Sequence, residues 1–371
     1  MKVMILAAGL GTRLRPLTDL ISKPMVPIVN KPVMAHIIEL LKKLNFEEII
    51  VNLHWYPEAI KNYFKDGAAF GVNIHYSYED KLLGTAGGVK NAKDFFGNKT
   101  FLIMSGDALT DIDLKDLIKF HKQKNGLCTM VLTTVDEPSA YGVVILNEEK
   151  RITGFQEKPP QGKEKSKLAN SGIYVFEPEI FNYIPDDEFY DFGADVFPQT
   201  VEENTPIYGY INYRYWNDVG SLSEYMRGNF DALNRKVEVN IPGTEISKNI
   251  WVGENCTVHE DVIMSPPICI GKNCIIEKDA KLFGPLIIGD DTLIKERAVL
   301  YKGIKWGSGY IGKDASLIGA IIGESTEIGD QAHILENAVI GSESVIASGT
   351  IIHPSVKIMS QQIIDKNNHS Y

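Results

Sequence analysis

The residues best suited to bind phosphate lie close together near the start of the chain. Gly9 and Gly11 follow a short apolar run, and glycines in such a loop let backbone N–H groups approach a ligand closely. Arg13 lies in the same loop, and Lys23 follows ten residues later. Fixed cations beside a glycine loop suit a nucleoside triphosphate, because transfer of its α-phosphoryl group requires charge on the departing pyrophosphate to be neutralised.

Neither of the two common phosphate-loop motifs describes this segment. Leu14 occupies the place of the third glycine of the dinucleotide fingerprint, and no Gly-Lys-Ser/Thr follows as in a Walker A loop. For two glycines alone, a tight turn with solvated basic residues is the simpler interpretation. The longer pattern, GLGTRLRPLT at 9–18 followed by KPM at 23–25, favours a phosphate site instead.

Alternating strand-like and helix-like segments surround this loop over residues 1–236. Apolar runs at 2–7, 48–52 and 100–105 have the character of buried strands. The alternation predicts a parallel sheet covered by helices on both faces, with ligands bound beyond the carboxyl ends of its strands. Asp113 precedes a helical pattern, and we expect it to cap that helix.

The second part of the chain repeats every six residues. A large apolar residue recurs at this spacing over 252–300 and again over 322–358, often with a small residue nearby. This is the hexapeptide pattern of a parallel β-helix, in which three repeats form one coil of about 18 residues. Cys256 and Cys274 should therefore stack on one face as small core residues. The period breaks at 301–310, where we expect an extruded loop.

Composition excludes some classes of partner. The formal net charge of −10 argues against binding to nucleic acid or to an anionic membrane surface. No stretch is long and apolar enough to predict a membrane span, and the apolar run at the N-terminus is too short for a signal peptide. The four cysteines form neither CxxC nor a zinc-like cluster, which suits a reducing, cytoplasmic compartment.

Several segments resemble, in the same order, the signatures of the sugar-1-phosphate nucleotidylyltransferases. These segments are GLGTRLRPLT with KPM at 9–25, Ser-Gly-Asp at 105–107, Phe-Gln-Glu-Lys-Pro at 155–159, Asn-Ser-Gly-Ile-Tyr at 170–174 and Trp-Asn-Asp-Val-Gly at 216–220. The resemblance is closest to the mannose-1-phosphate guanylyltransferase branch, on the evidence of Glu79, LGTAGG at 83–88 and EPSAYGVV at 137–144. With the β-helix, it extends over nearly the whole chain.

The resemblance implies a domain order and a reaction. A Rossmann-like nucleotidyltransferase domain at 1–236 would be followed by a linker at 237–250, a left-handed β-helix at 251–360 and a polar tail at 361–371. A sugar-1-phosphate oxygen would attack the α-phosphorus of a nucleoside triphosphate, releasing pyrophosphate and forming a nucleotide sugar. The closest branch makes GTP and mannose-1-phosphate the expected pair. A phosphate monoester is already a competent nucleophile, so no covalent intermediate is expected.

The resemblance also implies a catalytic set. Asp107 and Asp218 would hold Mg²⁺, which proteins commonly bind through one or two carboxylates together with phosphate oxygens and water. Arg13 would stabilise charge on the α-phosphate and pyrophosphate, and Lys23 would contact the phosphates from the other side. Lys158 would bind the phosphate of the sugar phosphate.

Further residues would contact the two substrates. Glu157 would accept hydrogen bonds from sugar hydroxyls, and Gly142, Asn170 and Gly172 would lie close to the sugar ring. The nucleotide would lie against residues from two segments: Leu6, Ala8, Gly9, Gly11, Thr12, Arg13, Glu79, Gly84 and Thr85.

Three alternatives remain open at this point. Gln156 and the segment 191–195 depart from the branch's usual pattern, so a glucose-1-phosphate enzyme using dTTP, UTP or ATP is one alternative. A second is added acyltransferase activity in the β-helix, for which the candidates are His259, His333 and His353. The third is a non-catalytic regulatory subunit, against which the intact catalytic set argues. The β-helix is otherwise expected to assemble the chain into a homo-oligomer.

Overall fold

The computed structural model describes residues 1–365, which divide into two compact units. The first unit comprises Met1–Leu10 and Ile37–Asp218, and the second joins Gly11–His36 to the chain from Val219 onward. The segment that carries Arg13 and Lys23 therefore belongs to the same compact unit as the β-helix.

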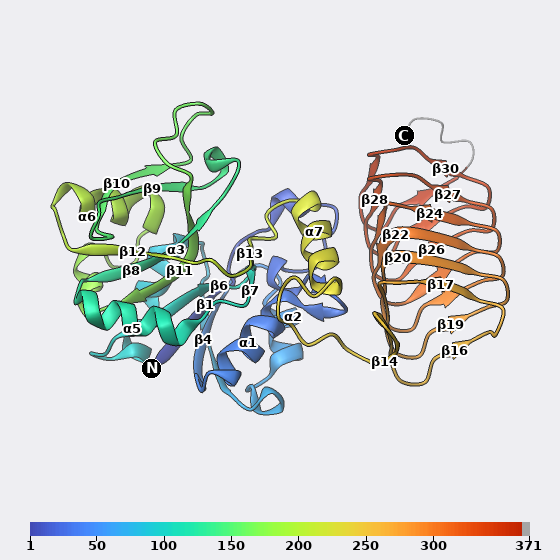
Figure 1. Cartoon of the computed structure of the whole chain (residues 1–371), viewed down its shortest axis with the longest axis horizontal. Helices are drawn as coiled ribbons and strands as arrows, with labels where there is room; N and C mark the ends of the chain where they lie inside the picture. The colour runs from blue at the N-terminus through green and yellow to red at the C-terminus, as the bar shows by residue number, and fades with distance from the viewer. Residues whose placement is uncertain (366–371) are drawn as a thin grey trace. The chain divides into compact units, whose positions relative to one another are not determined.

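A mixed β-sheet forms the core of the first unit (Figure 1). In its parallel part, β1 lies between β4 and β6, and β5 lies outside β4; these strands are β1 (Lys2–Leu6), β4 (Glu48–Leu53), β5 (Asn73–Tyr78) and β6 (Phe101–Ser105). The sheet continues through β11 (Leu168–Phe176), which runs antiparallel to β6, to β8 (Cys128–Thr134), β9 (Gly142–Leu146), β10 (Ile152–Glu157) and β12 (Ile207–Ile211). The expected parallel sheet is therefore found only in part, because strands such as β9 and β10 form an antiparallel hairpin that needs no helical crossover.

Helices cover this sheet as the alternation predicted. They are α1 (Val33–Lys43), α2 (Pro57–Phe64), α3 (Gly84–Asn91), α4 (Lys93–Phe96), α5 (Leu114–Lys124) and α6 (Phe197–Glu202). Apolar side chains of α3, α4 and α6 pack with those of β6, β8 and β11 in one buried cluster. Asp113 caps α5 as expected, since its carboxylate accepts hydrogen bonds from the N–H groups of Lys115 (3.1 Å) and Asp116 (3.0 Å).

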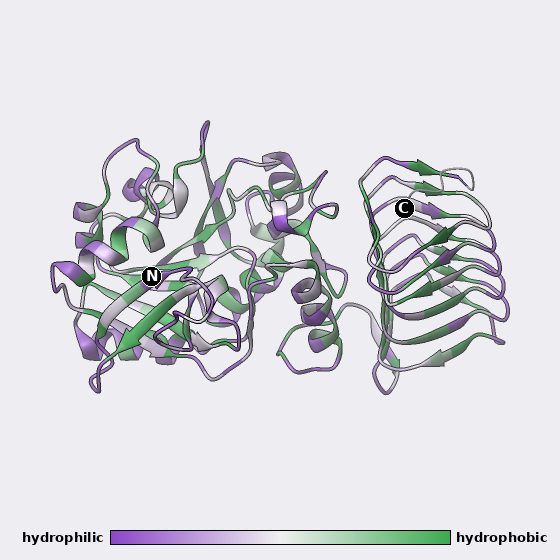
Figure 2. Cartoon of the chain, turned by 90° about the horizontal axis from the view of Figure 1, so that it is seen from above, coloured by the Kyte–Doolittle hydropathy of each residue, from purple (hydrophilic) through white to green (hydrophobic). Residues whose placement is uncertain are grey.

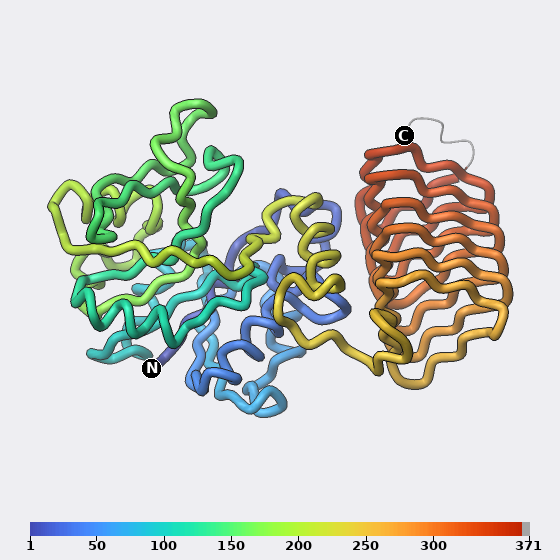
Figure 3. Tube along the Cα trace, in the orientation of Figure 1, coloured from blue at the N-terminus to red at the C-terminus, as the bar shows by residue number. Residues whose placement is uncertain are grey.

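The second unit is dominated by a parallel β-helix, whose coils stack regularly in Figure 3. Residues 18 apart pair in successive coils, for example Ile250 with Ile268 and Ile268 with Leu286. The inward Ile and Leu side chains are buried in one continuous core, and in Figure 2 many of these strands are hydrophobic. This confirms the fold class expected from the hexapeptide pattern.

Most strands of the β-helix region have two or three residues, and the first of them, β14, runs antiparallel to β15 before the parallel coils begin. They are β14 (Thr244–Ser247), β15 (Ile250–Val252), β16 (Thr257–Val258), β17 (Ile263–Ser265), β18 (Ile268–Ile270), β19 (Ile275–Ile276), β20 (Lys281–Ile288), β21 (Leu293–Ile294), β22 (Val299–Lys305), β23 (Gly309–Ile311), β24 (Ser316–Ile318), β25 (Ile321–Ile322), β26 (Thr326–Ile328), β27 (His333–Ile334), β28 (Val339–Ile340), β29 (Val345–Ile346), β30 (Ile351–Ile352), β31 (Lys357–Ile358) and β32 (Ile363–Ile364). The same unit holds α7 (Leu222–Leu233) and the small hairpin of β2 (Pro27–Ile28) and β3 (Lys31–Pro32).

Cys256 and Cys274 stack in adjacent coils as expected. The backbone N–H of Cys274 donates to the Sγ of Cys256 at 3.4 Å, and both thiols are free. Burial raises the pKa of the Cys274 thiol to about 12, which keeps it protonated and unreactive.

The expected extruded loop at 301–310 is wrong. Ile294 pairs with Ile311 and Leu300 with Leu317, so the coil here has 17 residues instead of 18, as does the next one, in which Leu317 pairs with Ile334. Lys305 takes the inward position five residues after Leu300 and is fully buried. The period was obscured because a lysine fills an otherwise apolar position.

Backbone oxygens compensate for the burial of Lys305. Its Nζ donates to the carbonyl oxygens of Trp306 (2.6 Å), Ser308 (2.5 Å) and, in the next coil, Gly323 (3.4 Å). Burial nevertheless lowers the pKa of Lys305 to about 7. Its ammonium therefore joins two successive coils.

The repeat also continues beyond residue 360. β32, within the range expected as a polar tail at 361–371, pairs in register with β29, because Ile364 again follows Ile358 by six residues. Residues 366–371 of that expected tail lie outside the described residues. Among residues 1–365, no helix combines the length and apolar character needed to cross a membrane.

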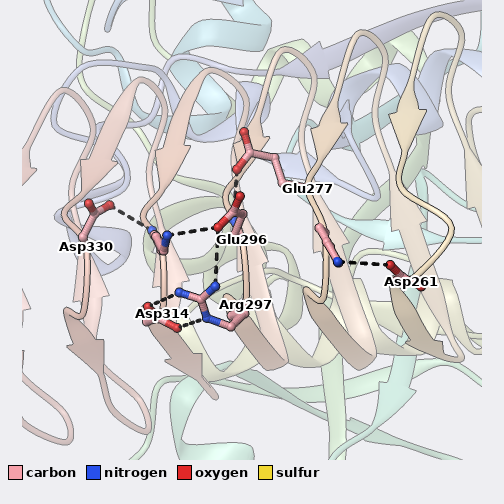
Figure 4. Close-up of polar contacts among 8 residues, drawn as sticks. Asp261, Glu277, Glu296, Arg297, Asp314 and Asp330 are labelled. Atoms are coloured by element: carbon pink, nitrogen blue, oxygen red, sulfur yellow. Dashed lines mark hydrogen bonds and ion pairs between the residues drawn. The ribbon is translucent and has the colours of Figure 1, made fainter.

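Charged side chains form a ladder along the outside of the β-helix (Figure 4). Arg297 binds both carboxylate oxygens of Asp314, at 2.7 and 2.8 Å, and Lys313 contacts Glu296 at 3.0 Å. The backbone N–H of Glu296 donates to the carboxylate of Glu277 in the preceding coil. Exposed ion pairs such as these each contribute about 0–1 kcal/mol to the free energy of unfolding. We therefore infer that they help to keep successive coils in register and have no catalytic role.

Candidate active site

The basic phosphate-loop segment folds around a left-handed glycine. Gly11 has φ 65°, and a Cβ there would lie 3.0 Å from Cβ of Lys23 and 3.3 Å from Cγ2 of Thr18. The Thr18 hydroxyl donates to the carbonyl oxygen of Gly11 at 2.7 Å, which closes the turn. The structure thus brings the stem of Lys23 against the glycine turn that leads into Thr12 and Arg13. A side chain at residue 11 would be strained and would displace Lys23.

In the first unit, the loop after β1 is held by a buried polar network. The backbone N–H of Ala7 donates to Asn52 Oδ1 (2.7 Å), and Asn52 Nδ2 donates to Glu79 Oε1 (2.7 Å). The other Glu79 oxygen accepts from the N–H of Leu83 at 3.0 Å. Since both oxygens of Glu79 are occupied and only 5% of the residue is exposed, Glu79 connects β4 to the segment that begins α3. Its direct contact with nucleotide stays a prediction.

The backbone beside this network leaves room for a ligand. A Cβ built at Gly9 would meet no atom of the described residues within 4 Å. Leu6 is half-buried and Ala8 is buried, and the Leu6 carbonyl accepts from the N–H of Gly106 at 2.8 Å. The loops after β1 and β6 therefore meet at the carboxyl ends of adjacent parallel strands, where a site was expected.

Gly84 and Thr85 begin α3 and contact the segment before α6. Gly84 has φ 74°, and a Cβ there would lie 2.4 Å from the carbonyl oxygen of Tyr190. The Thr85 hydroxyl donates to Asp191 Oδ2 (2.8 Å) and accepts from the N–H of Phe192 (2.9 Å). Both residues thus connect the expected nucleotide side to the unusual 191–195 segment.

The two expected metal ligands come from neighbouring strands. β7 (Leu109–Thr110) pairs antiparallel with β13 (Trp216–Asn217), with Asn217 opposite Leu109. Asp218 therefore continues from β13 on the side where Asp107 precedes β7. Asp107 accepts a 2.5 Å hydrogen bond from Ser105 Oγ, and Asp218 accepts one from the Tyr141 hydroxyl at 3.4 Å.

This arrangement fits magnesium chemically. Mg²⁺ prefers oxygen ligands and usually retains waters and substrate phosphates alongside one or two carboxylates. Within residues 1–365 there is no group of three or more His, Cys, Asp and Glu residues placed to hold a metal ion. Asp107 and Asp218 would supply two such carboxylates.

The expected sugar-phosphate residues gather around the β9–β10 hairpin. Glu157 pairs with Gly142 across the hairpin, and Lys158 Nζ lies 3.0 Å from Glu157 Oε1. A Cβ would lie 3.1 Å from Glu157 Oε2 if built at Gly142, and 2.4 Å from it if built at Gly193. Two glycines thus make the space that the Glu157 carboxylate occupies.

Asn170 and Gly172 shape the adjacent strand β11. The N–H of Gly172 donates to Asn170 Oδ1 at 3.0 Å, and Asn170 Nδ2 donates to the Tyr174 hydroxyl at 2.8 Å. Gly172 has φ 73° and interrupts the pairing of β11 with β8. The local bulge follows from that left-handed residue.

The expected site residues divide between the two units. Gly11, Thr12, Arg13 and Lys23 lie in the second unit, and the first contains the rest. Several residues with clear supporting contacts were not among those expected: Asn52, Ser105, Tyr141, Asp191 and Gly193. Asn52 is a polar residue within a mostly apolar buried strand, but the sequence does not show that its partners are Ala7 and Glu79. Gly193 had no signal in the sequence, because only the three-dimensional position of Glu157 explains it.

The β-helix histidines make local contacts. His333 Nδ1 lies 2.8 Å from the Ser316 hydroxyl on the outer surface, and His259 Nδ1 accepts from the N–H of Asp261 at 3.2 Å. His353 is exposed. All three histidines thus lie on the outer surface of the β-helix or at its edge in the described residues.

Family comparisons agree with this architecture. A model described as nucleotidyl transferase matches residues 2–235, and one described as bacterial transferase hexapeptide (six repeats) matches residues 319–361. The chain therefore belongs to the nucleotidyl transferase family and is an enzyme of that class. The resemblance drawn from its motifs is confirmed.

Individual relatives differ in their named substrates. A UTP–glucose-1-phosphate uridylyltransferase of Synechocystis is 42% identical over 278 residues, covering 71% of each chain. Mannose-1-phosphate guanylyltransferase 1 of Arabidopsis thaliana is 30% identical over 382 residues, covering 97% of this chain and 98% of the relative. The structure of HddC from Yersinia pseudotuberculosis complexed with GMP-PN matches 62% of this chain and 97% of its own, at 26% identity and a TM-score of 0.54.

Proposed function

We propose that this enzyme transfers a nucleoside monophosphate from a nucleoside triphosphate to a sugar-1-phosphate, releasing pyrophosphate. The observation that carries this proposal is the convergence of Asp107 and Asp218 beside the loop after β1, in a chain of the nucleotidyl transferase family. The names of its relatives supply the sugar-1-phosphate as acceptor.

In this proposal each substrate has its own group of residues. The nucleotide lies against the loop after β1 and the start of α3, with Arg13 and Lys23 binding its phosphates. The sugar phosphate lies at the β9–β10 hairpin, where Lys158 binds its phosphate and Glu157 accepts from its hydroxyls. The acceptor phosphate oxygen attacks in line with the departing pyrophosphate, and no side-chain nucleophile is needed.

Magnesium is the cofactor of this proposal. Asp107 and Asp218 would hold it, and when bound it would neutralise charge on the phosphates. The protein's own contribution is to orient these carboxylates, through Ser105 on Asp107 and Tyr141 on Asp218.

We propose GTP and mannose-1-phosphate as the preferred pair. Similarity to a guanylyltransferase over 97% of the chain, with the β-helix included, supports this choice. UTP with glucose-1-phosphate is the second candidate, because the Synechocystis uridylyltransferase has the higher identity of 42%, though over 71% of the chain.

The substrate pair is tested by a panel of reactions. GTP, UTP, dTTP, ATP and CTP would each be combined with mannose-1-phosphate and with glucose-1-phosphate, and the nucleotide sugar formed would be identified by mass spectrometry. We expect kcat/KM to be highest for GTP with mannose-1-phosphate. A higher value for UTP with glucose-1-phosphate would replace the substrate assignment while retaining the reaction.

A further inference from the structure

A buried chain of hydrogen bonds connects the β-helix to the segment that carries Lys23. The indole Nε1 of Trp306 donates to the Tyr225 hydroxyl at 2.7 Å. That hydroxyl donates in turn to the carbonyl oxygen of Pro27 at 2.8 Å. Trp306 is 3% exposed and Tyr225 is fully buried, and all three residues belong to the same compact unit.

The two hydrogen bonds that connect Trp306, Tyr225 and Pro27 can run in one direction only. An indole N–H can only donate, so the Tyr225 oxygen must accept from it and present its own hydrogen to Pro27. Burial raises the pKa of Tyr225 well above its usual value, which keeps this hydrogen in place. Such directed bonds in a dry interior specify position more closely than an apolar contact of the same size.

The Pro27 carbonyl has no partner within the hairpin. The N–H of Val33 donates to the Val26 carbonyl at 3.0 Å, so Pro27 and Pro32 form the next, non-hydrogen-bonded pair of the ladder, in which carbonyl groups point away from the partner strand. Side chains of α7 supply the donors instead, since Asn229 Nδ2 also approaches the Pro27 carbonyl at 3.4 Å. The Pro27 carbonyl is thus held by Tyr225 and Asn229 of α7 rather than by the hairpin itself.

Further bonds hold the segment on both sides of Pro27. Asn229 Oδ1 accepts from the N–H of Val29 at 2.9 Å, and Asn30 Nδ2 donates to the Ile288 carbonyl of the β-helix at 2.8 Å. Toward Lys23, the N–H of Val26 donates to the Lys23 carbonyl at 3.1 Å. The backbone of Lys23 is therefore one turn away from a carbonyl fixed by the β-helix.

Trp306, at the β-helix end of this series of hydrogen bonds, is also held in place. The carbonyl oxygen of Trp306 accepts from the buried ammonium of Lys305, which also bonds to Ser308 and to Gly323 in the next coil. The residue next to Lys305, Trp306, is thereby held where its indole reaches Tyr225 of α7.

We propose that Trp306 and Tyr225 are positioning residues for the transfer reaction, acting through Pro27 on the placement of Lys23 toward the nucleotide phosphates. This inference rests on the proposed function, which assigns Lys23 to those phosphates. In this proposal the β-helix helps to position Lys23 of the same polypeptide, whether or not the subunits assemble.

Trp306→Phe and Tyr225→Phe test the proposal, because each keeps an aromatic ring and removes one polar group. We expect each variant in the full-length protein to lower kcat/KM for the nucleoside triphosphate about fivefold to tenfold, the size of one buried hydrogen bond. KM for the sugar phosphate should stay within twofold of wild type. Tyr301→Phe, at a half-exposed position on the β-helix, is the matched control and should leave both parameters unchanged.

A double-mutant cycle with Lys23 separates positioning from a purely structural role. In a Lys23→Gln background, Trp306→Phe should cause no further loss of kcat/KM for the nucleotide. The proposal is overturned if the two losses multiply, if both substrates are affected equally, or if Trp306→Phe lowers only the unfolding temperature. A wild-type protein without transfer activity on any substrate pair would instead refute the proposed function on which this inference rests.

Discussion

At the scale of single residues, the Glu157 carboxylate occupies a space that only glycine at residue 193 provides. A methyl group there would lie 2.4 Å from Glu157 Oε2, and this contact requires the carboxylate to move. We therefore predict that Gly193→Ala raises KM for the sugar phosphate at least tenfold, since about 1.4 kcal/mol of lost binding corresponds to tenfold. KM for the nucleotide should change little in steady-state measurements.

Gly97→Ala is the control for backbone strain without contact to Glu157. A Cβ at Gly97 meets nothing within 4 Å in the described residues, but φ 63° with ψ −148° is a conformation essentially restricted to glycine, so this variant should lose stability and keep both KM values. Equal changes in the two KM values for Gly193→Ala would argue that the glycine serves the fold rather than the sugar pocket.

Asn52 supports the nucleotide side in a comparable way. Asn52→Ala would leave the Ala7 N–H and one oxygen of Glu79 without their buried partner. A buried group that loses its hydrogen bond costs about 1–3 kcal/mol, so we predict a lower free energy of unfolding by that amount and a higher KM for the nucleotide. Urea denaturation and steady-state kinetics check the two effects. An unchanged midpoint of unfolding would contradict the importance of this network.

The role of a single residue could be predicted from the sequence where that role depends on nearby residues or on the repeat. Asp113 could be predicted as a helix cap and Cys256 with Cys274 as a stacked pair, because a cap and an 18-residue repeat are properties of nearby residues. Gly193 and Asn52 could not be assigned, because each is explained by a side chain that is remote in the sequence.

At the scale of elements, α1 contains a buried histidine that links stability to pH. His36 Nε2 lies 2.9 Å from the Ile28 carbonyl, and its Nδ1 has no hydrogen-bond partner within the described residues. Burial, together with the charge of Lys31, lowers the pKa of His36 from 6.5 to about 4. Protonation would therefore place an unpaired charge in the interior.

The sign of the pH effect follows from that lowered pKa. Between pH 6.5 and 4 the unfolded chain binds more protons at His36 than the folded chain does. The contribution of neutral His36 to the free energy of unfolding is therefore complete above pH 6.5 and is lost as the pH falls toward 4. We predict a loss of about 3 kcal/mol from this residue over that range. His36→Gln should show a flatter dependence in urea unfolding at several pH values. Identical pH profiles for the two proteins would rule out His36 as the cause.

The elements themselves were predictable to different degrees. The six-residue period fixed the β-helix and its core, since nearly every repeat places an Ile, Leu or Val inward. The coil at 301–310 escaped prediction because Lys305 is satisfied by backbone oxygens, which the sequence does not show. The antiparallel strands β9 to β11 were likewise not distinguishable from parallel ones by their apolar content.

At the scale of the whole molecule, the most informative feature is the membership of Gly11–His36 in the β-helix unit. The sequence order places this segment inside the nucleotidyl transferase domain, and the family model includes it there. Only long-range contacts, such as that of Asn30 with Ile288, show that it also packs with the β-helix. The basic residues proposed to bind phosphate are thereby connected to the repeat domain.

We also predict that the β-helix assembles the chain into a homo-oligomer. Apolar side chains remain exposed on its outer strands, including Ile263 (52%) and Ile351 (52%), and such surfaces favour subunit contacts. Light scattering at micromolar concentration should give a mass above the 41.3 kDa of one chain. A monomeric mass would contradict this prediction and leave the proposed reaction unaffected.

The central claim is that Asp107 and Asp218 support magnesium-dependent transfer from a nucleoside triphosphate to a sugar-1-phosphate. Its most direct test is pyrophosphate release by the full-length protein with GTP, mannose-1-phosphate and Mg²⁺. We predict release that depends on the sugar phosphate, stops with EDTA and falls at least a hundredfold in Asp107→Asn, the order of loss typical when an electrostatic stabiliser is removed. Full pyrophosphate release by folded Asp107→Asn, or none by wild type with any nucleotide and sugar-phosphate pair, would contradict the claim.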